Sequence, residues 1–395
     1  MKGLFKSLPF RLLVGIIIGV LVGMVATEEM MVVFVTLRYI LGQLITFCVP
    51  LIVIGFIAPS ITRLGGSASK MLGIAILLAY VSSIGAAFLS MAAGYMIIPG
   101  LSITSEVEGL KELPGIFFEL SIPQIMPVMS ALVLSILIGL AAAWTKARTF
   151  TNILEEFQLI VLDIVTKVVI PILPFYIAFT FCGMGYEGSI TKQLPVFLKV
   201  IVIVLIGHYI WMALLYFIAG VYSGKNPIEV VKHYGPAYIT AIGTMSSAAT
   251  LAVALKCAKK AEPPLRDDMV NFGVPLFANI HLCGSVLTEV FFVMTVSLLL
   301  YGSLPSLPNM ILFCLLLGIF AIGAPGVPGG TVMASLGLIT GVLGFNDAGT
   351  ALMLAIFALQ DSFGTACNVT GDGALTLMLT GYAEKHKMEE QKNIL

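Results

Sequence analysis

Residues 360–375 read QDSFGTACNVTGDGAL, and they place polar side chains inside an otherwise apolar region. The flanking stretches, GTALMLAIFAL and TLMLTGYA, carry no charge. The polar residues are spaced i, i+4, i+7 and i+11, so they fall on one face of a helix. Charged side chains at membrane depth are costly and normally face an interior site. The stripe therefore predicts a binding surface for cations or an amine, formed by Asp361, Thr365, Asn368 and Asp372.

The composition indicates an integral membrane protein. Of the 395 residues, 59% are hydrophobic and 11% are charged, whereas soluble domains carry about a quarter charged residues. The net charge is zero and no extended basic run occurs, which argues against a nucleic-acid partner. The six cysteines are scattered in apolar runs without a CxxC motif, so we expect core residues and not disulfides or a metal site.

The apolar segments predict eight transmembrane spans, because most of them reach the ~20 residues that a helix needs to cross the hydrocarbon core. We expect the first segment to be a retained helix and not a cleaved signal peptide. Basic residues gather in alternate loops, so both termini are expected in the cytoplasm. The predicted spans are 10–27, 31–60, 71–99, 115–145, 153–186, 195–222, 268–302 and 346–382.

Two shorter segments, 236–257 and 307–342, share a pattern of apolar arm, small residues and apolar arm. Their centres read AIGTMSSAATLAVAL (241–255) and AIGAPGVPGGTVMASL (321–336). Each total length suits two half-spanning arms, and non-helical backbone at membrane depth is tolerated only where it faces protein or a wet cavity. The second centre holds too many helix breakers for a merely kinked helix. We therefore predict two re-entrant hairpins that enter from opposite sides as inverted repeats, with a binding site where their tips meet.

The polar stripe also admits other functions or structural roles. Asp361 and Asp372 are separated by about 16 Å along a helix, too far for the dyad of an intramembrane protease. No GxSxG motif supports a serine hydrolase, so we expect no enzyme. A simple buried ion pair lacks a basic partner, because Lys167 has Asp163 one turn away and only Arg38 and Lys199 remain. A channel stays open as an alternative, since small-residue hairpins also form filters.

The chain resembles the dicarboxylate/amino acid:cation symporters, the glutamate transporter homologues. The resemblance rests on NVTGD (368–372), MSSAATL (245–251), GVPGG (326–330), VIPILPFYIAF (169–179) and FVTLRYILGQLITFCVPLIVIGFIAPSITRLG (34–65). It implies an all-α, elevator-type membrane fold of eight transmembrane helices and two re-entrant hairpins. It also implies a homotrimeric secondary transporter, which we expect in a prokaryotic inner membrane. Its transport core would be 71–100 and 194–395, and its scaffold 1–70 and 101–193.

The same resemblance implies roles for individual residues. Asp361 would bind the substrate's amine. The first hairpin tip would hold the substrate's α-carboxylate, because helix N-termini bind anions. No cofactor is implied beyond the coupling ion, which is sodium or a proton. The substrate-binding positions would be Ser246, Ser247, Ser285, Val327, Gly330, Asp361, Gly364, Thr365 and Asn368. The cation-binding positions would be Tyr80, Ser82, Ser83, His281, Cys283, Asn368 and Asp372.

The chain departs from the family pattern at the seventh span, where NMDGT becomes HLCGS (281–285). Cys283 takes the place of a cation-binding aspartate, and hard cations prefer oxygen ligands. On the second hairpin, Ala321 and Ala324 replace hydroxyl residues. Glu289 falls where mammalian relatives carry a proton-coupling glutamate, so sodium coupling and proton coupling both stay open. A channel, a receptor-like protein or an uncoupled facilitator is the alternative from another class.

Two positions indicate the charge of the substrate, because relatives with acidic substrates carry arginine at one or the other of them. Here they hold Met245 and Gly364. A second carboxylate would then lack a bidentate partner. We predict a neutral amino acid with a small to medium side chain, and we expect Gly364 to leave open space in the pocket. Glutamate, aspartate or a C4-dicarboxylate is the alternative substrate.

Overall fold

A computed structural model describes residues 8–65, 70–101, 111–188, 190–261, 264–324, 326 and 328–388. Within these ranges the regular structure is entirely helical. Six stretches are long and apolar enough to cross a membrane. They begin at Glu28, Lys70, Arg148, Pro195, Asp267 and Asp347. The predicted all-α membrane class is confirmed.

Most of the helices follow one another with short connections, and a long non-helical stretch that includes residues 111–127 precedes α4. In chain order they are α1 (Leu8–Val25), α2 (Glu28–Gly65), α3 (Lys70–Ile97) with the 3₁₀ turn Ile98–Leu101, α4 (Val128–Thr145), α5 (Arg148–Ile164), the π turn Val165–Val169, α6 (Ile170–Glu187), α7 (Ile190–Ser223), α8 (Ile228–Val231), α9 (Gly235–Thr244), α10 (Ser247–Lys259), α11 (Asp267–Ile280), α12 (Cys283–Tyr301), α13 (Leu307–Gly323), α14 (Gly330–Gly341) and α15 (Asp347–Lys385).

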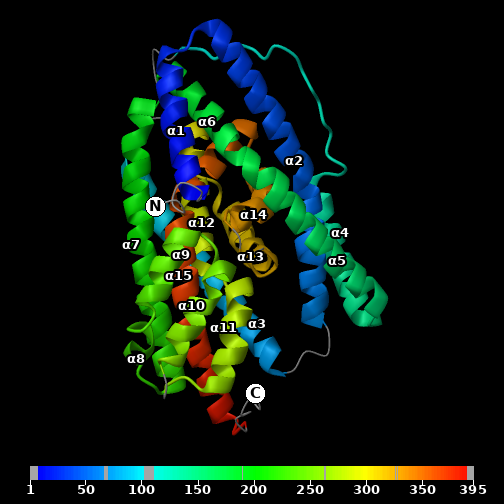
Figure 1. Ribbon diagram of the computed structural model, residues 1–395, viewed down its shortest axis with the longest axis vertical. Helices are drawn as coiled ribbons and strands as arrows, with labels where there is room; N and C mark the ends of the chain where they lie inside the picture. Colours follow the sequence, from blue (N-terminus) through cyan, green and yellow to red (C-terminus); the bar gives the residue numbers. More distant parts are fainter. Residues whose placement is uncertain are drawn as a thin grey trace.

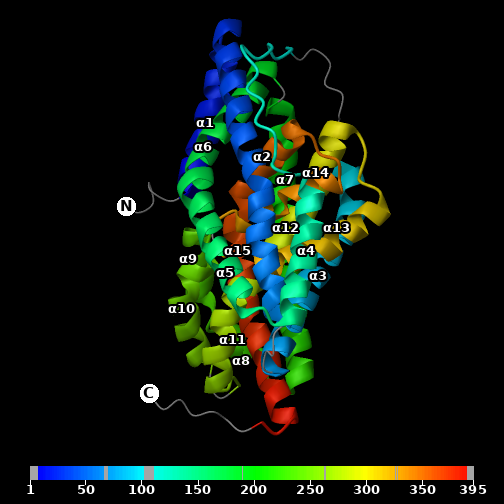
Figure 2. The ribbon, with the colours of Figure 1, turned by 90° about the vertical axis from the view of Figure 1, so that its right-hand side faces the viewer.

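The helices form two packed groups (Figures 1 and 2). One group is α1, α2, α4, α5 and α6, and the other is α3, α7 and α9 to α15. In the first group, α1 packs closely on α6 because Gly15, Gly19 and Gly23 form a small-residue stripe. A Cβ added to Gly19 would lie 2.2 Å from the carbonyl oxygen of Ala178. The two groups meet where α13 and α14 contact α2, where α14 contacts α4, and where α15 contacts α1 and α6.

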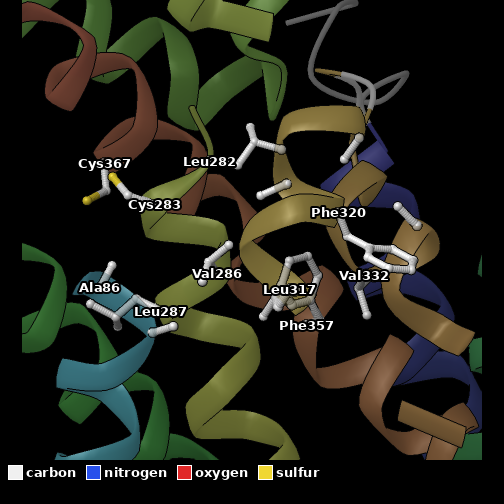
Figure 3. Close-up of a cluster of buried hydrophobic side chains, with 14 of the residues drawn as sticks. Ala86, Leu282, Cys283, Val286, Leu287, Leu317, Phe320, Val332, Phe357 and Cys367 are labelled. Carbon is white, nitrogen blue, oxygen red and sulfur yellow. The ribbon is translucent and has the colours of Figure 1, made fainter. Parts of the chain in front are cut away.

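The second group is built around α12 and α15. The apolar windows of Asp267–Tyr301 and Asp347–Lys385 are 94% and 78% buried, against 33% for those of α3 and α7. Figure 3 shows Leu287 of α12 beside Ala86 of α3, and Leu317 of α13 beside Phe357 of α15. Polar groups on α12 and α15 are therefore enclosed by protein, while the outer helices α3 and α7 present apolar side chains to their surroundings.

Both predicted helix-break-helix segments are present. The first is α9 and α10, whose chain turns at Met245 in the left-handed region (φ 51°). The second is α13 and α14, joined by residues 324–329. Figure 2 shows α10 in the lower half of the molecule and α14 in the upper half. The two segments thus approach the middle of the molecule from opposite ends.

Two predicted spans differ from the structure. Segment 115–145 is helical only as α4, because Pro123 and Pro127 disfavour helix in the residues before them. The non-helical part binds α2 instead, where the backbone N–H of Phe117 donates to Thr36 Oγ1 at 2.8 Å. Segment 268–302 is interrupted at His281 and Leu282, between α11 and α12.

Two smaller predictions are confirmed. The six cysteines are free and buried. Lys167 Nζ lies 2.5 Å from Asp163 Oδ2, and both side chains are largely exposed. The ion pair therefore lies at the surface and not in a polar interior site.

Candidate functional site

The two hairpin tips meet directly. Ser246 Oγ donates to the carbonyl oxygen of Gly326 at 2.6 Å, which joins the first tip to the second. The same hydroxyl accepts from the backbone N–H of Ala249 at 3.1 Å and so caps the N-terminus of α10. Ser247 and Gly330 are the first residues of α10 and α14. The N-terminus of α10 therefore lies against the second tip, and a helix N-terminus can bind an anion.

Asp361 binds the second hairpin tip. Its Oδ2 accepts from the backbone N–H of Gly329 at 2.6 Å, and Gly329 directly precedes α14. The side chain is 3% exposed. A carboxylate at a helix N-terminus is favourable because of the helix dipole. Asp361, which the family resemblance assigns to a substrate amine, is thus in contact with the second hairpin.

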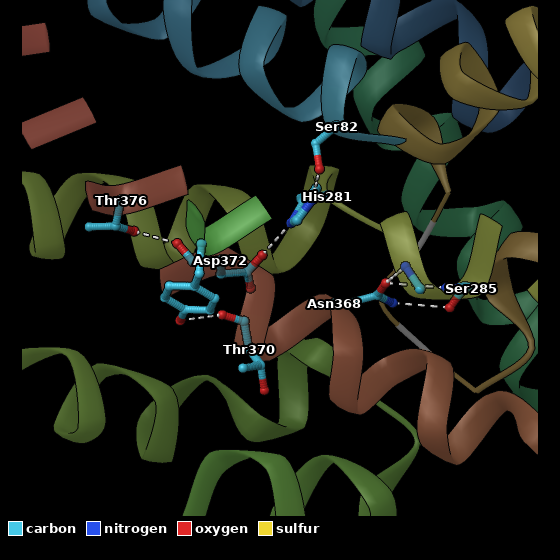
Figure 4. Close-up of polar contacts among 9 residues, drawn as sticks. Ser82, His281, Ser285, Asn368, Thr370, Asp372 and Thr376 are labelled. Atoms are coloured by element: carbon cyan, nitrogen blue, oxygen red, sulfur yellow. Dashed lines mark hydrogen bonds and ion pairs between the residues drawn. The ribbon is translucent and has the colours of Figure 1, made fainter. Parts of the chain in front are cut away.

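Asn368 binds the break in the seventh span. Its Oδ1 accepts from the backbone N–H of Gly284 at 2.7 Å and from that of Ser285 at 3.3 Å. Its Nδ2 donates to Ser285 Oγ at 3.0 Å (Figure 4). The first N–H groups of a helix have no partner within the helix. Asn368 supplies that partner for α12, and so it holds α15 against the interrupted span.

His281 joins three elements. Its Nδ1 lies 2.9 Å from Asp372 Oδ1 on α15, and its Nε2 lies 2.8 Å from Ser82 Oγ on α3 (Figure 4). All three side chains are buried. A carboxylate only accepts, so Nδ1 donates to Asp372, and in the neutral ring Nε2 accepts from Ser82. The prediction that the stripe carboxylates lack a basic partner is wrong for Asp372, because the sequence alone does not place His281 beside it.

Glu289 links α12 to the second hairpin. Ser335 Oγ on α14 donates to Glu289 Oε1. The glutamate is fully buried, and its Oε2 has no hydrogen-bond partner among the residues that the structure describes. A single hydroxyl contact is little compensation for a buried carboxylate. Glu289 is therefore a group whose protonation would affect how α14 packs on α12.

Some of the remaining predicted residues lie among these buried polar side chains, and others do not. Thr365 is buried on α15 between Asp361 and Asn368, and Cys283 and Ser83 are also buried. Tyr80 donates to the carbonyl oxygen of Leu315 at 3.3 Å, so its hydroxyl contacts α13 and not the cluster around His281. Val327 lies outside the described residues.

Gly364 does not face open space, contrary to expectation. A Cβ added there would lie 3.2 Å from both Cα and N of Ser285. The missing side chain allows α15 to approach the backbone of α12 closely. The reason is rotational: Gly364 points at α12, and the sequence spacing alone does not reveal which neighbour fills that side of the helix.

Sequence reasoning did not assign His208 or Ser335 to this region. His208 on α7 is buried, and its Nε2 lies 3.0 Å from the carbonyl oxygen of Gly284 and 2.9 Å from Thr288 Oγ1. It therefore contacts the first turn of α12, as Asn368 also does. The available signal was a histidine in the middle of an otherwise apolar span.

The hairpin tips contact each other, and the polar face of α15 contacts both the second tip and the interrupted span. A family model for the sodium:dicarboxylate symporter family matches residues 8–381. The chain belongs to the sodium:dicarboxylate symporter family. This is a family of membrane symporters and not of enzymes.

Individual relatives of the chain are named as amino acid transporters. Excitatory amino acid transporter 2 of Mus musculus is 29% identical over 249 residues, which cover 60% of this chain and 41% of that protein. Neutral amino acid transporter B(0) of Rattus norvegicus is 29% identical over 220 residues, which cover 54% of this chain and 39% of that protein. A putative sodium-dependent excitatory amino acid transporter of Caenorhabditis elegans is 26% identical over 273 residues, covering 66% and 52%. The chain thus matches only about half or less of each relative.

Family membership also explains why Ser82, His281 and Asp372 are not a hydrolase triad. Their order of contacts resembles one, yet Ser82 is 5% exposed and lies among packed helices. Across the described ranges, no group of three or more His, Cys, Asp or Glu side chains is placed to hold a metal ion. The cluster is a connection between helices of the symporter.

Proposed function

We propose that this symporter moves a neutral amino acid with a small to medium side chain by cation-coupled alternating access. The observation that carries the proposal is the position of Asp361. A buried carboxylate lies on the last helix, beside two converging hairpin tips that present helix N-termini. An α-amino acid has the complementary charges, because its ammonium group suits Asp361 and its α-carboxylate suits the N–H groups of the tips.

The lack of an arginine supports a neutral side chain. The only arginine in residues 194–395 is Arg266. It precedes α11 and binds Asp268, with distances of 2.6 Å and 3.0 Å to the two carboxylate oxygens. Met245 is 1% exposed at the first tip. A second substrate carboxylate would therefore find no guanidinium at Met245, at Gly364 or nearby.

The elevator motion is proposed on the relation of the two packed groups. In Figures 1 and 2, α11 and α15 extend farther toward the lower end than α1, α2 and α6, which extend farther toward the upper end. We assign residues 1–70 and 101–193 to the scaffold, and residues 71–100 and 194–395 to the moving core. Eight spans, re-entrant hairpins, a homotrimer and cytoplasmic termini in a prokaryotic inner membrane complete the proposal.

Proton coupling through Glu289 is supported by its contact with Ser335 on the hairpin arm. A proton on Glu289 would remove a buried charge at the joint between α12 and α14. The alternative from another class, an uncoupled facilitator or channel, is favoured by one observation. The HLCGS segment carries a thiol, Cys283, at a predicted cation position.

Uptake into proteoliposomes tests the proposal. Labelled neutral amino acids, glutamate and a C4-dicarboxylate are compared for the wild type and for Asp361→Asn, under imposed sodium and proton gradients. Asp347→Asn is the matched control, because Asp347 lies exposed in the first turn of the same helix. Uptake of neutral amino acids that Asp361→Asn abolishes and Asp347→Asn preserves supports the proposal. Preferential uptake of dicarboxylates contradicts it.

A further inference from the structure

The environment of Asp372 differs from that of a cation site. The family resemblance assigns Asp372 to a sodium site together with the Asn368 carbonyl, and it places another cation site on the third span at Tyr80, Ser82 and Ser83. In the structure, Asp372 Oδ1 instead accepts from His281 Nδ1 at 2.9 Å. His281 stands where the family pattern has an asparagine. The side chain that departs from the pattern is thus the one that binds the aspartate.

The other donors of the expected set are engaged or unsuitable. Asn368 Oδ1 accepts from two backbone N–H groups at the start of α12. Tyr80 directs its hydroxyl to Leu315. Cys283 offers sulfur where a hard cation prefers oxygen. Among the described side chains of the set, Asp372 Oδ2 and Ser83 Oγ are left without a hydrogen-bond partner. Two oxygens are few for a hard cation, which binds several.

The imidazole ring fills space as well as forming bonds. A Cβ added to Gly371 would lie 2.9 Å from His281 Cε1, so the ring edge lies directly on the backbone of α15. Its second nitrogen is bound to Ser82 at 2.8 Å. An ion bound at this place would hold together α3, the break between α11 and α12, and α15. His281 already connects these same three elements with hydrogen bonds that are built into the chain.

We propose that the imidazole of His281 takes the place of a coupling sodium ion at Asp372, so that this position binds no sodium. This inference deepens the proposed symport function and rests on it, because a sodium ion is a coupling ion only in a symporter. It concerns one position only, and sodium at a different position of the transporter is compatible with it. Its consequence is that α3, α15 and the break between α11 and α12 are held together at Asp372 whether or not sodium is present.

The test measures sodium-specific thermal stabilisation of the purified protein without substrate. NaCl is compared with choline chloride at constant ionic strength, since an ion that binds only the folded state raises Tm by mass action. The variants are Asp372→Asn, whose amide oxygen still accepts from His281, and the double variant His281→Asn/Cys283→Asp, which restores oxygen donors. His233→Asn is the control for a histidine outside this cluster.

We expect wild type, Asp372→Asn and His233→Asn to have the same sodium response, and the double variant to gain a rise of several degrees. A wild-type response that disappears in Asp372→Asn overturns the proposal, because sodium would then bind at Asp372 beside His281. A folded double variant without a gain also overturns it. If the double variant does not fold, the comparison of wild type with Asp372→Asn still decides. Because no substrate is present, failure of the transport proposal gives a different result, an absence of uptake.

Discussion

Replacing Asp361 by asparagine tests the assignment of the substrate's amine. The change keeps side-chain volume and removes the charge. Gly329 N–H donates to Asp361 Oδ2 at 2.6 Å. A hydrogen bond to a charged group contributes about 1.5–3 kcal/mol and one between neutral groups about 1 kcal/mol, so the hairpin contact should weaken and not vanish. Removing one partner of a buried charged pair costs on the order of 2–5 kcal/mol.

These magnitudes predict a large loss of affinity. At about 1.4 kcal/mol per factor of ten, apparent affinity should fall by roughly 30-fold to a few thousand-fold. Equilibrium binding of a labelled neutral amino acid to the purified transporter measures this effect, with Asp347→Asn as the control on the same helix. An unchanged affinity in Asp361→Asn would refute the reasoning, because the substrate would then carry no amine in contact with Asp361.

Three further predictions follow from other contacts. Glu289→Gln should abolish uptake driven by an inward proton gradient, since the amide still accepts from Ser335 but binds no proton; retained proton-driven accumulation would exclude Glu289 from coupling. Gly19→Val should lower Tm by several degrees, because the added Cβ would lie 2.2 Å from the carbonyl oxygen of Ala178, whereas Gly73→Val, with nothing within 4 Å of the added Cβ, measures the cost of valine alone; equal effects in the two variants would contradict the α1–α6 packing. Gly364→Arg should destabilise the protein, because the added side chain meets the backbone of Ser285; a folded variant that prefers glutamate would show that position 364 opens into the pocket.

The sequence predicted the positions of the helical segments better than it predicted which segments contact one another. Both hairpins were located because small residues and helix breakers interrupt apolar arms, a purely local signal. The polar face of α15 was located because helical spacing decides which residues share a face. The family was identified from short motifs that span nearly the whole chain. These predictions depend on local pattern, and local pattern is what a sequence carries directly.

Contacts between distant elements could not be read in the same way. The pairing of His281 with Asp372 depends on the break before α12 and on how far α15 is rotated. The close approach at Gly364 depends on the same rotation. The prediction of a helix over 115–127 is wrong. The stretch is apolar, but Pro123 and Pro127 disfavour helix in the residues before them.

The most direct test of coupled transport is accumulation against a gradient. Proteoliposomes containing the purified transporter are given equal concentrations of a labelled small neutral amino acid on both sides, and then an inward sodium or proton gradient. The proposal predicts internal accumulation above the external concentration under at least one gradient, and its collapse when an ionophore dissipates that gradient. Equal concentrations on both sides under every gradient would contradict symport and indicate a facilitator or channel.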